Sequence, residues 1–160
     1  MFHSLASQIA FVALFATCGF AFAKGSYVER WAAGFICLSW SLSAAISAIW
    51  NGLFPADIQE LTFLAVDAAT AIGLLILAMR FAKVWLGVAM LMQSVELALH
   101  GAAMADWGIK FNLYMLMNNI VSFSLLLLLA GATATAWSQR AQGKQGKTPR
   151  PPSGSLELPI

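Results

Sequence analysis

The sequence predicts an all-α integral membrane bundle of five transmembrane helices. Of its 160 residues 60% are hydrophobic and only 10% are charged, with a mean hydropathy of +0.77. A soluble globular domain carries about 25% charged residues. The hydrophobic residues gather into five segments, each reaching the roughly 20 residues that a helix needs to cross a bilayer. Backbone groups in lipid must be satisfied within the segment, so these segments are expected to be helices.

The five predicted spans follow one another through residue 137. They are Leu5–Ala23, Ala32–Phe54, Leu61–Met79, Val84–Met104 and Phe111–Trp137. The first span ends in Ala-Phe-Ala, which is typical of a signal-peptidase site, but no basic residue precedes it. A secretory signal peptide has a basic region before its apolar core, so we expect the first helix to be retained.

The composition changes at Ser138. Residues 138–160 are rich in Gly, Pro, Ser and basic residues, a composition that cannot bury a hydrophobic core. We therefore expect a transmembrane domain over residues 1–137 and a disordered, basic tail over residues 138–160.

The basic residues predict the orientation of the chain in the membrane. Only Lys110 stands apart when the helices alternate in direction; the other eight of the nine Lys and Arg fall on one side, at Lys24, Arg30, Arg80, Lys83, Arg140, Lys144, Lys147 and Arg150. The positive-inside rule makes that side cytoplasmic. The predicted topology is N-out and C-in, with Asp57, Glu60 and Asp106 in the outer loops.

The fourth span carries a polar stripe in an otherwise apolar helix. Gln93, Glu96 and His100 stand at spacings i, i+3 and i+7, which places them on one face of a helix. Ionisable side chains are costly on a lipid-facing surface, so this face should meet protein or a water-filled cavity.

Polar residues of three other spans fall at the same depth as this stripe. We estimate the depth of each polar residue by counting along its helix at a rise of about 1.5 Å per residue. This places a predicted polar cluster in the outer half of the bilayer, made of Asp67, Gln93, Glu96, His100, Asn118, Asn119, Ser47 and Asn51. The third span also has a small-residue row, Ala65, Ala69 and Gly73, opposite Asp67. Such rows allow close helix contact, so we expect this span to be packed on two sides and central.

Several functions compete for the polar cluster. It is a hydrogen-bonded core that fixes helix pairing, or it admits a cation or relays a proton. In a third hypothesis Glu96 and His100 share a metal with Asp67, or His3 and His100 bind haem. An acid–base pair of Glu96 and His100 comes last, because no nucleophile, HExxH, GxSxG, P-loop or dinucleotide motif accompanies it.

The same sequence argues against several other classes of function. Cys18 and Cys37 lie in apolar runs without zinc-ligand spacing, and no basic patch interleaved with aromatics indicates nucleic acid. We therefore expect a membrane protein without enzymatic activity, metal or cofactor. Its expected partners are the lipid bilayer and a homo-oligomer or larger membrane complex, in which it is an accessory or assembly subunit. The alternative is a small cation- or proton-linked transporter or channel.

Short motifs along the chain resemble a group of small polytopic inner-membrane proteins of unknown function, mostly from alphaproteobacteria. The residues that carry the resemblance are Glu29-Arg30-Trp31-Ala32-Ala33, Leu64-Ala65-Val66-Asp67, Trp85, and Gln93 seven residues before His100. It covers about residues 1–135 and implies a bacterial inner-membrane location but no activity. The chain departs from the pattern at Leu86 and Met92, where Pro and an aromatic residue are common, and Glu96 is an addition.

Overall fold

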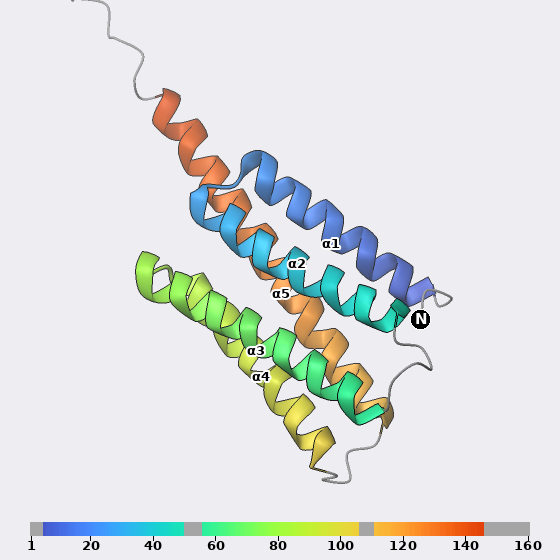
Figure 1. Cartoon of the computed structure of the whole chain (residues 1–160). Coiled ribbons are helices and arrows are strands. Elements are labelled where there is room, and N and C mark those ends of the chain that lie inside the picture. Colours follow the sequence, from blue (N-terminus) through green and yellow to red (C-terminus); the bar gives the residue numbers. More distant parts are fainter. Residues whose placement is uncertain (1–4, 50–55, 106–110, 146–160) are drawn as a thin grey trace, which may run out of the picture.

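The structure is a computed structural model that describes residues 5–49, 56–105 and 111–145, and all of its regular secondary structure there is helical (Figure 1). The helices are α1 Leu5–Lys24, α2 Tyr27–Ile49, α3 Ala56–Phe81, α4 Val84–Met104 and α5 Phe111–Gln145. The predicted all-α, five-helix fold is therefore confirmed.

Four helices contain stretches that are long and apolar enough to cross a membrane, namely Tyr27–Ile49, Ile58–Phe81, Val84–Met104 and Leu113–Gln142. In α1 the apolar stretch within the described residues is Gln8–Lys24. Large apolar side chains cover the outside of the bundle, and Met79 and Val84 are 79% and 85% exposed. This architecture is consistent with a multi-pass membrane protein.

The helices form a closed ring in which each packs against the next and α5 returns to α1. Helices α2 and α5 also contact each other across the ring, so each has three neighbours, whereas α3 contacts only α2 and α4. The prediction that this helix is packed on two sides is therefore confirmed, but the central position belongs to α2 and α5. The small-residue row of α3 is used at one point only. Ala65 and Ala69 are exposed, and Gly73 is buried against Phe35 of α2.

The apolar core fills the half of the ring next to the two short turns. Its members come from the end of α1, the start of α2, the end of α3, the start of α4 and the second half of α5, and include Leu14, Cys18, Ala32, Ile36, Leu74, Leu86, Ala89, Leu125 and Leu129. Trp40 packs against this core and meets the ring of Phe11 edge-on at 6.3 Å. The other half of the ring holds most of the buried polar side chains, together with a few apolar ones such as Ile46 and Val66.

Helix α2 begins at Tyr27, five residues before the predicted start at Ala32. A contact between Ser26 and Glu29 accompanies this start. The Glu29 carboxylate accepts hydrogen bonds from the backbone N–H of Ser26 at 2.7 Å and from the Ser26 hydroxyl. The first bond is the carboxylate half of a capping box and satisfies a backbone donor at the helix start. Only the two residues Gly25 and Ser26 therefore separate α1 from α2.

Two other boundaries differ from the prediction. Helix α3 begins at Ala56, so Asp57 and Glu60 lie in its first turns rather than in a loop. Helix α5 continues eight residues beyond Trp137 to Gln145. Its last turns are rich in Gln, Ala, Arg and Lys, which favour helix, and so the first part of the predicted tail is helical. Residues 146–160 lie outside the described part of the chain.

Basic residues gather at one end of the bundle, where the two short turns and the end of α5 lie together (Figure 1). The Nζ atom of Lys24 lies 5.5 Å from the ring centroid of Trp137. The rings of Tyr27 and Phe81 stand 6.2 Å apart and join the start of α2 to the end of α3. These contacts place the basic residues of both turns and of α5 at the same end, as the charge pattern requires.

Candidate functional site

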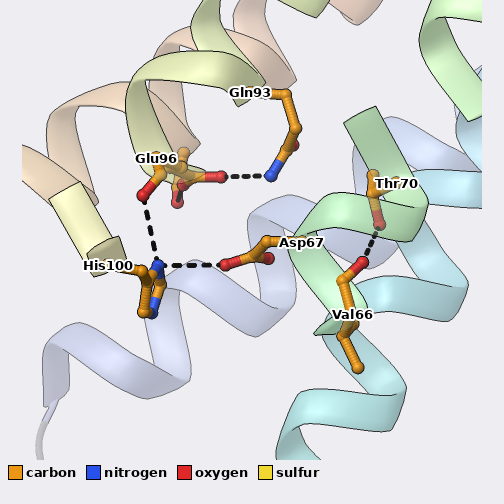
Figure 2. A network of polar contacts seen from close by, with 7 residues as sticks. Val66, Asp67, Thr70, Gln93, Glu96 and His100 are labelled. Carbon is orange, nitrogen blue, oxygen red and sulfur yellow. Dashed lines mark hydrogen bonds and ion pairs between the residues drawn. The ribbon is translucent and has the colours of Figure 1, made fainter. Parts of the chain in front are cut away.

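A network of polar side chains joins three helices in the half of the bundle away from the short turns (Figure 2). It centres on the stripe of α4. Gln93 and Glu96 are buried, at 2% and 6% exposure, and the His100 side chain is 17% exposed. The spacing of these residues turns all three toward the inside of the ring because they share one face of the helix.

Both carboxylate oxygens of Glu96 accept hydrogen bonds. Gln93 Nε2 donates to Oε2 at 2.8 Å from the preceding turn of α4. Ser122 Oγ donates to Oε1 at 2.5 Å from α5. The buried carboxylate thereby connects α4 to α5 and leaves neither oxygen without a donor.

His100 connects the same stripe to α3. Its Nδ1 lies 3.1 Å from Oδ2 of Asp67 and 3.2 Å from the backbone oxygen of Glu96 (Figure 2). Two acceptors around one ring nitrogen favour the forms of the imidazole in which Nδ1 carries the hydrogen. The ring of Tyr114 on α5 stands edge-on to the imidazole at 5.6 Å and closes the side toward α5.

Thr70 lies one turn beyond Asp67 on α3 and is buried. Its hydroxyl donates to the backbone oxygen of Val66 at 2.9 Å (Figure 2). This bond satisfies the hydroxyl within its own helix, so Thr70 borders the network without extending it.

Acidic groups outnumber basic ones in this network. It holds the carboxylates of Asp67 and Glu96 against the single imidazole of His100. Among the described residues, Lys and Arg occur only in the two short turns, in the adjoining helix ends and near the end of α5, at the opposite end of the bundle. When every group is ionised the network therefore carries one unbalanced negative charge in a segment that is apolar by composition.

The structure brings four of the eight predicted cluster residues together: Asp67, Gln93, Glu96 and His100. Ser47 is buried on α2 and Asn118 is half-buried on α5, and neither is hydrogen-bonded to the described network. Asn119 is exposed on the outside of α5. Adjacent residues on a helix point about 100° apart, so Asn118 and Asn119 cannot both face the stripe. Asn51 lies outside the described residues.

Sequence reasoning missed Ser122, which supplies the contact from α5. The residue stands four positions after Asn118, on the same face of the helix, and that spacing was the available signal. It also missed Glu29, although Ser26-Tyr27-Val28-Glu29 matches the S-x-x-E pattern of a capping box.

The metal hypothesis finds no support in the geometry. Within the described part of the chain, no three His, Cys, Asp or Glu side chains come together as ligands for a metal ion. Asp67, Glu96 and His100 are engaged with one another and with Gln93 and Ser122 instead. The haem hypothesis depends on His3, which lies outside the described residues.

Comparisons with protein families, with curated proteins and with solved structures find no match. The resemblance to small inner-membrane proteins therefore stays a prediction.

Proposed function

We propose that the protein is a non-enzymatic, multi-pass protein of the bacterial inner membrane, where it is an accessory or assembly subunit of a membrane complex. The observation that carries the proposal is the mutual saturation of the buried polar groups. Glu96 accepts from both Gln93 and Ser122, and His100 pairs with Asp67. Such a network serves to lock three helices in register. Interhelical hydrogen bonds in membranes contribute on the order of 0.6–2 kcal/mol each, which is enough to explain its polar residues.

The outer surface of α5 supports a role in assembly. Asn119 is exposed there, between the exposed apolar side chains of Met115 and Phe123. An amide that faces hydrocarbon lacks the hydrogen-bond partners that water would provide. A neighbouring helix of another subunit, or of a second copy, satisfies it.

The orientation in this proposal follows from the basic end of the bundle. Lys24, Arg30, Arg80 and Lys83 stand at that end, and the positive-inside rule assigns it to the cytoplasm. The amino terminus is then outside, the carboxyl terminus is inside, and the Glu96 network lies in the outer half of the membrane.

The assembly role is tested by measuring the mass of the protein purified in mild detergent. We expect the native chain to run as a complex larger than one copy, and Asn119→Leu to run at the mass of a single folded copy. Ile72→Ala is the matched control and should leave the complex intact, because Ile72 is exposed on α3, a helix that does not contact α5 in the described bundle. A native chain that is monomeric, or a complex unchanged by Asn119→Leu, contradicts the proposal.

A second candidate function is proton- or cation-linked transport, and the unbalanced charge of the network favours it. An uncompensated carboxylate inside a membrane is costly, so one proton or small cation would neutralise the set. The groups that face Glu96 and His100 from the adjoining helices are Asp67 on α3, and Tyr114 and Ser122 on α5.

Asp67→Asn separates this candidate from a purely structural role, because the amide keeps hydrogen bonding and removes the charge. Transport predicts that the variant folds and loses a proton or cation flux in liposomes that the native protein shows. Ser94→Ala is the control, since Ser94 is exposed on α4 and its hydroxyl bonds only Met90 of its own helix. A folded Asp67→Asn variant with native flux, or a native protein without flux, rules transport through Asp67 out.

A further inference from the structure

An open groove lies between α2 and α3 at the basic end of the bundle, with a volume of about 160 Å³. Its walls are Tyr27, Trp31 and Phe35 of α2, and Ile76, Arg80 and Phe81 of α3. Trp31 and Ile76 are 48% and 58% exposed. The groove therefore opens on the outer surface of the bundle, where the apolar spans meet their surroundings.

The depth of the groove depends on Gly73. A Cβ atom at this position would stand 2.9 Å from the ring of Phe35, so any larger residue would push the ring away from α3. The aromatic wall is continuous, because ring centroids are 5.9 Å apart from Tyr27 to Trp31 and 6.4 Å apart from Trp31 to Phe35. Apart from Arg80, the side chains that line the groove are therefore apolar or aromatic, which suits contact with a hydrocarbon chain.

The mouth of the groove is positive. The guanidinium carbon of Arg80 lies 5.7 Å from the ring of Phe81. Two further basic residues are exposed close by in the sequence: Arg30 in the first turn of α2, and Lys83 just after the end of α3. Among the described residues the one acidic side chain at this end is Glu29, which is 2% exposed and bonded to Ser26. No exposed carboxylate of the described chain therefore offsets the basic charge.

We propose that this groove binds an anionic phospholipid, with one acyl chain along the aromatic wall and the phosphate on Arg80. A guanidinium matches phosphate with two parallel hydrogen bonds, which an ammonium group does not. Tyr and Trp are the residues that sit at the headgroup level of membranes. Basic pockets between membrane helices select anionic headgroups, so the charge at the mouth chooses an anionic lipid over a zwitterionic one.

The test uses the purified full-length protein in mild detergent with added phosphatidylglycerol or phosphatidylcholine of identical acyl chains. Bound lipid is counted by native mass spectrometry, and protection is read from the thermal unfolding midpoint. We expect phosphatidylglycerol to bind and protect at a concentration about tenfold lower than phosphatidylcholine, a ratio that equals roughly 1.4 kcal/mol. Equal binding of the two lipids overturns the proposal.

Matched variants separate this groove from general surface charge. Arg80→Gln should abolish the preference for phosphatidylglycerol, whereas Lys83→Gln, next to the groove but outside its lining, should retain it. Ile76→Trp fills the groove from its exposed side and should weaken both lipids without unfolding the bundle. The proposal is overturned if Arg80→Gln and Lys83→Gln lose the preference for phosphatidylglycerol equally. It is also overturned if inorganic phosphate alone protects as well as phosphatidylglycerol, or if the protein shows a doubled mass without bound lipid.

Discussion

The carboxyl groups of two buried glutamates, Glu29 and Glu96, find their hydrogen-bond partners in different ways. Both side chains are almost wholly enclosed, at 2% and 6% exposure. Glu29 accepts from Ser26, three residues earlier in the same turn of chain. Glu96 accepts from Gln93 on its own helix and from Ser122, 26 residues later, on α5.

The difference lies in what each contact fixes. Glu29 satisfies the start of α2 and acts within one turn, at the end of the bundle where the chain reverses. Glu96 stands at the thirteenth of the 21 residues of α4, far from either helix end, and its bonds determine how α4 meets α5. A carboxylate satisfied locally defines an element, whereas one satisfied across helices defines the packing and is the better candidate for function.

The largest effect is expected at the turn that brings Ser26 to Glu29. In Gly25→Ala the new Cβ atom would stand 2.3 Å from the backbone oxygen of Ala21 and 2.9 Å from the Cβ of Glu29. Neither neighbour is a flexible side-chain end, so the turn must shift. We expect the free energy of unfolding to fall by about 3 kcal/mol, which is at the upper end of the usual range for single substitutions. The change is measured by thermal or denaturant unfolding in mild detergent.

Gly34→Ala is the matched control for this substitution. Gly34 lies inside α2, and a Cβ atom there meets nothing within 4 Å. Alanine favours helix over glycine by about 1 kcal/mol, so the control should be as stable as the native chain or slightly more so. Equal destabilisation by both variants would contradict the close contact at Gly25.

The next effect tests the bonds that cross between helices. Glu96→Ala leaves the buried donors of Gln93 and Ser122 without their acceptor, which costs on the order of 2 kcal/mol. The combination of Glu96→Gln with Ser122→Ala in a double-mutant cycle should show a coupling of about 1 kcal/mol. In Glu96→Ala, amide hydrogen exchange should accelerate along both α4 and α5. Exchange that changes in α4 alone would show that the contact to α5 contributes nothing.

Much of the fold follows from hydrophobicity, but the helix ends do not. Five apolar segments predict five helices because the membrane demands internal hydrogen bonding. The start of α2 at Tyr27 is accompanied by the hydrogen bonds of Ser26 to Glu29, which are polar contacts within one turn. The end of α5 at Gln145 depends on helix propensity beyond the apolar span. Hydrophobicity reports neither of these forces.

The sequence predicts the depth of the network residues in the membrane, but not how each helix is rotated about its own axis. Spacing along α4 placed Gln93, Glu96 and His100 on one face, and counting residues placed Asp67 level with them. The rotation of α5 was not available, because two adjacent asparagines gave no unique inward face. Asn119 turns outward and Ser122 turns inward. The four-residue spacing from Asn118 to Ser122 marks one face of α5, but the packing of α5 against α4 and α1 decides which face turns inward.

A smaller effect is expected for Glu29→Ala. The substitution removes the acceptor for the Ser26 N–H and hydroxyl, a loss of a capping interaction worth about 1 kcal/mol. Faster hydrogen exchange should be confined to the first turn of α2. Acceleration that spreads into α5 would show that Glu29 also organises packing between helices, and the contrast with Glu96 would fail.

The smallest effect is expected at the turn between α3 and α4, which joins the two helices that carry Asp67 and His100. Ala82 has φ of 47°, and its N–H bonds the backbone oxygen of Ala78 at 2.9 Å, the arrangement that glycine adopts after helices. A left-handed conformation costs a non-glycine residue about 1 kcal/mol. Part of this is offset by the freedom that glycine adds to the unfolded chain. Ala82→Gly should therefore raise the unfolding midpoint slightly, whereas Ala98→Gly, exposed within α4, should lower it. If both variants lowered the unfolding midpoint, Ala82 would not be strained in the native turn. The turn would then allow the pairing of Asp67 with His100 without a conformational cost.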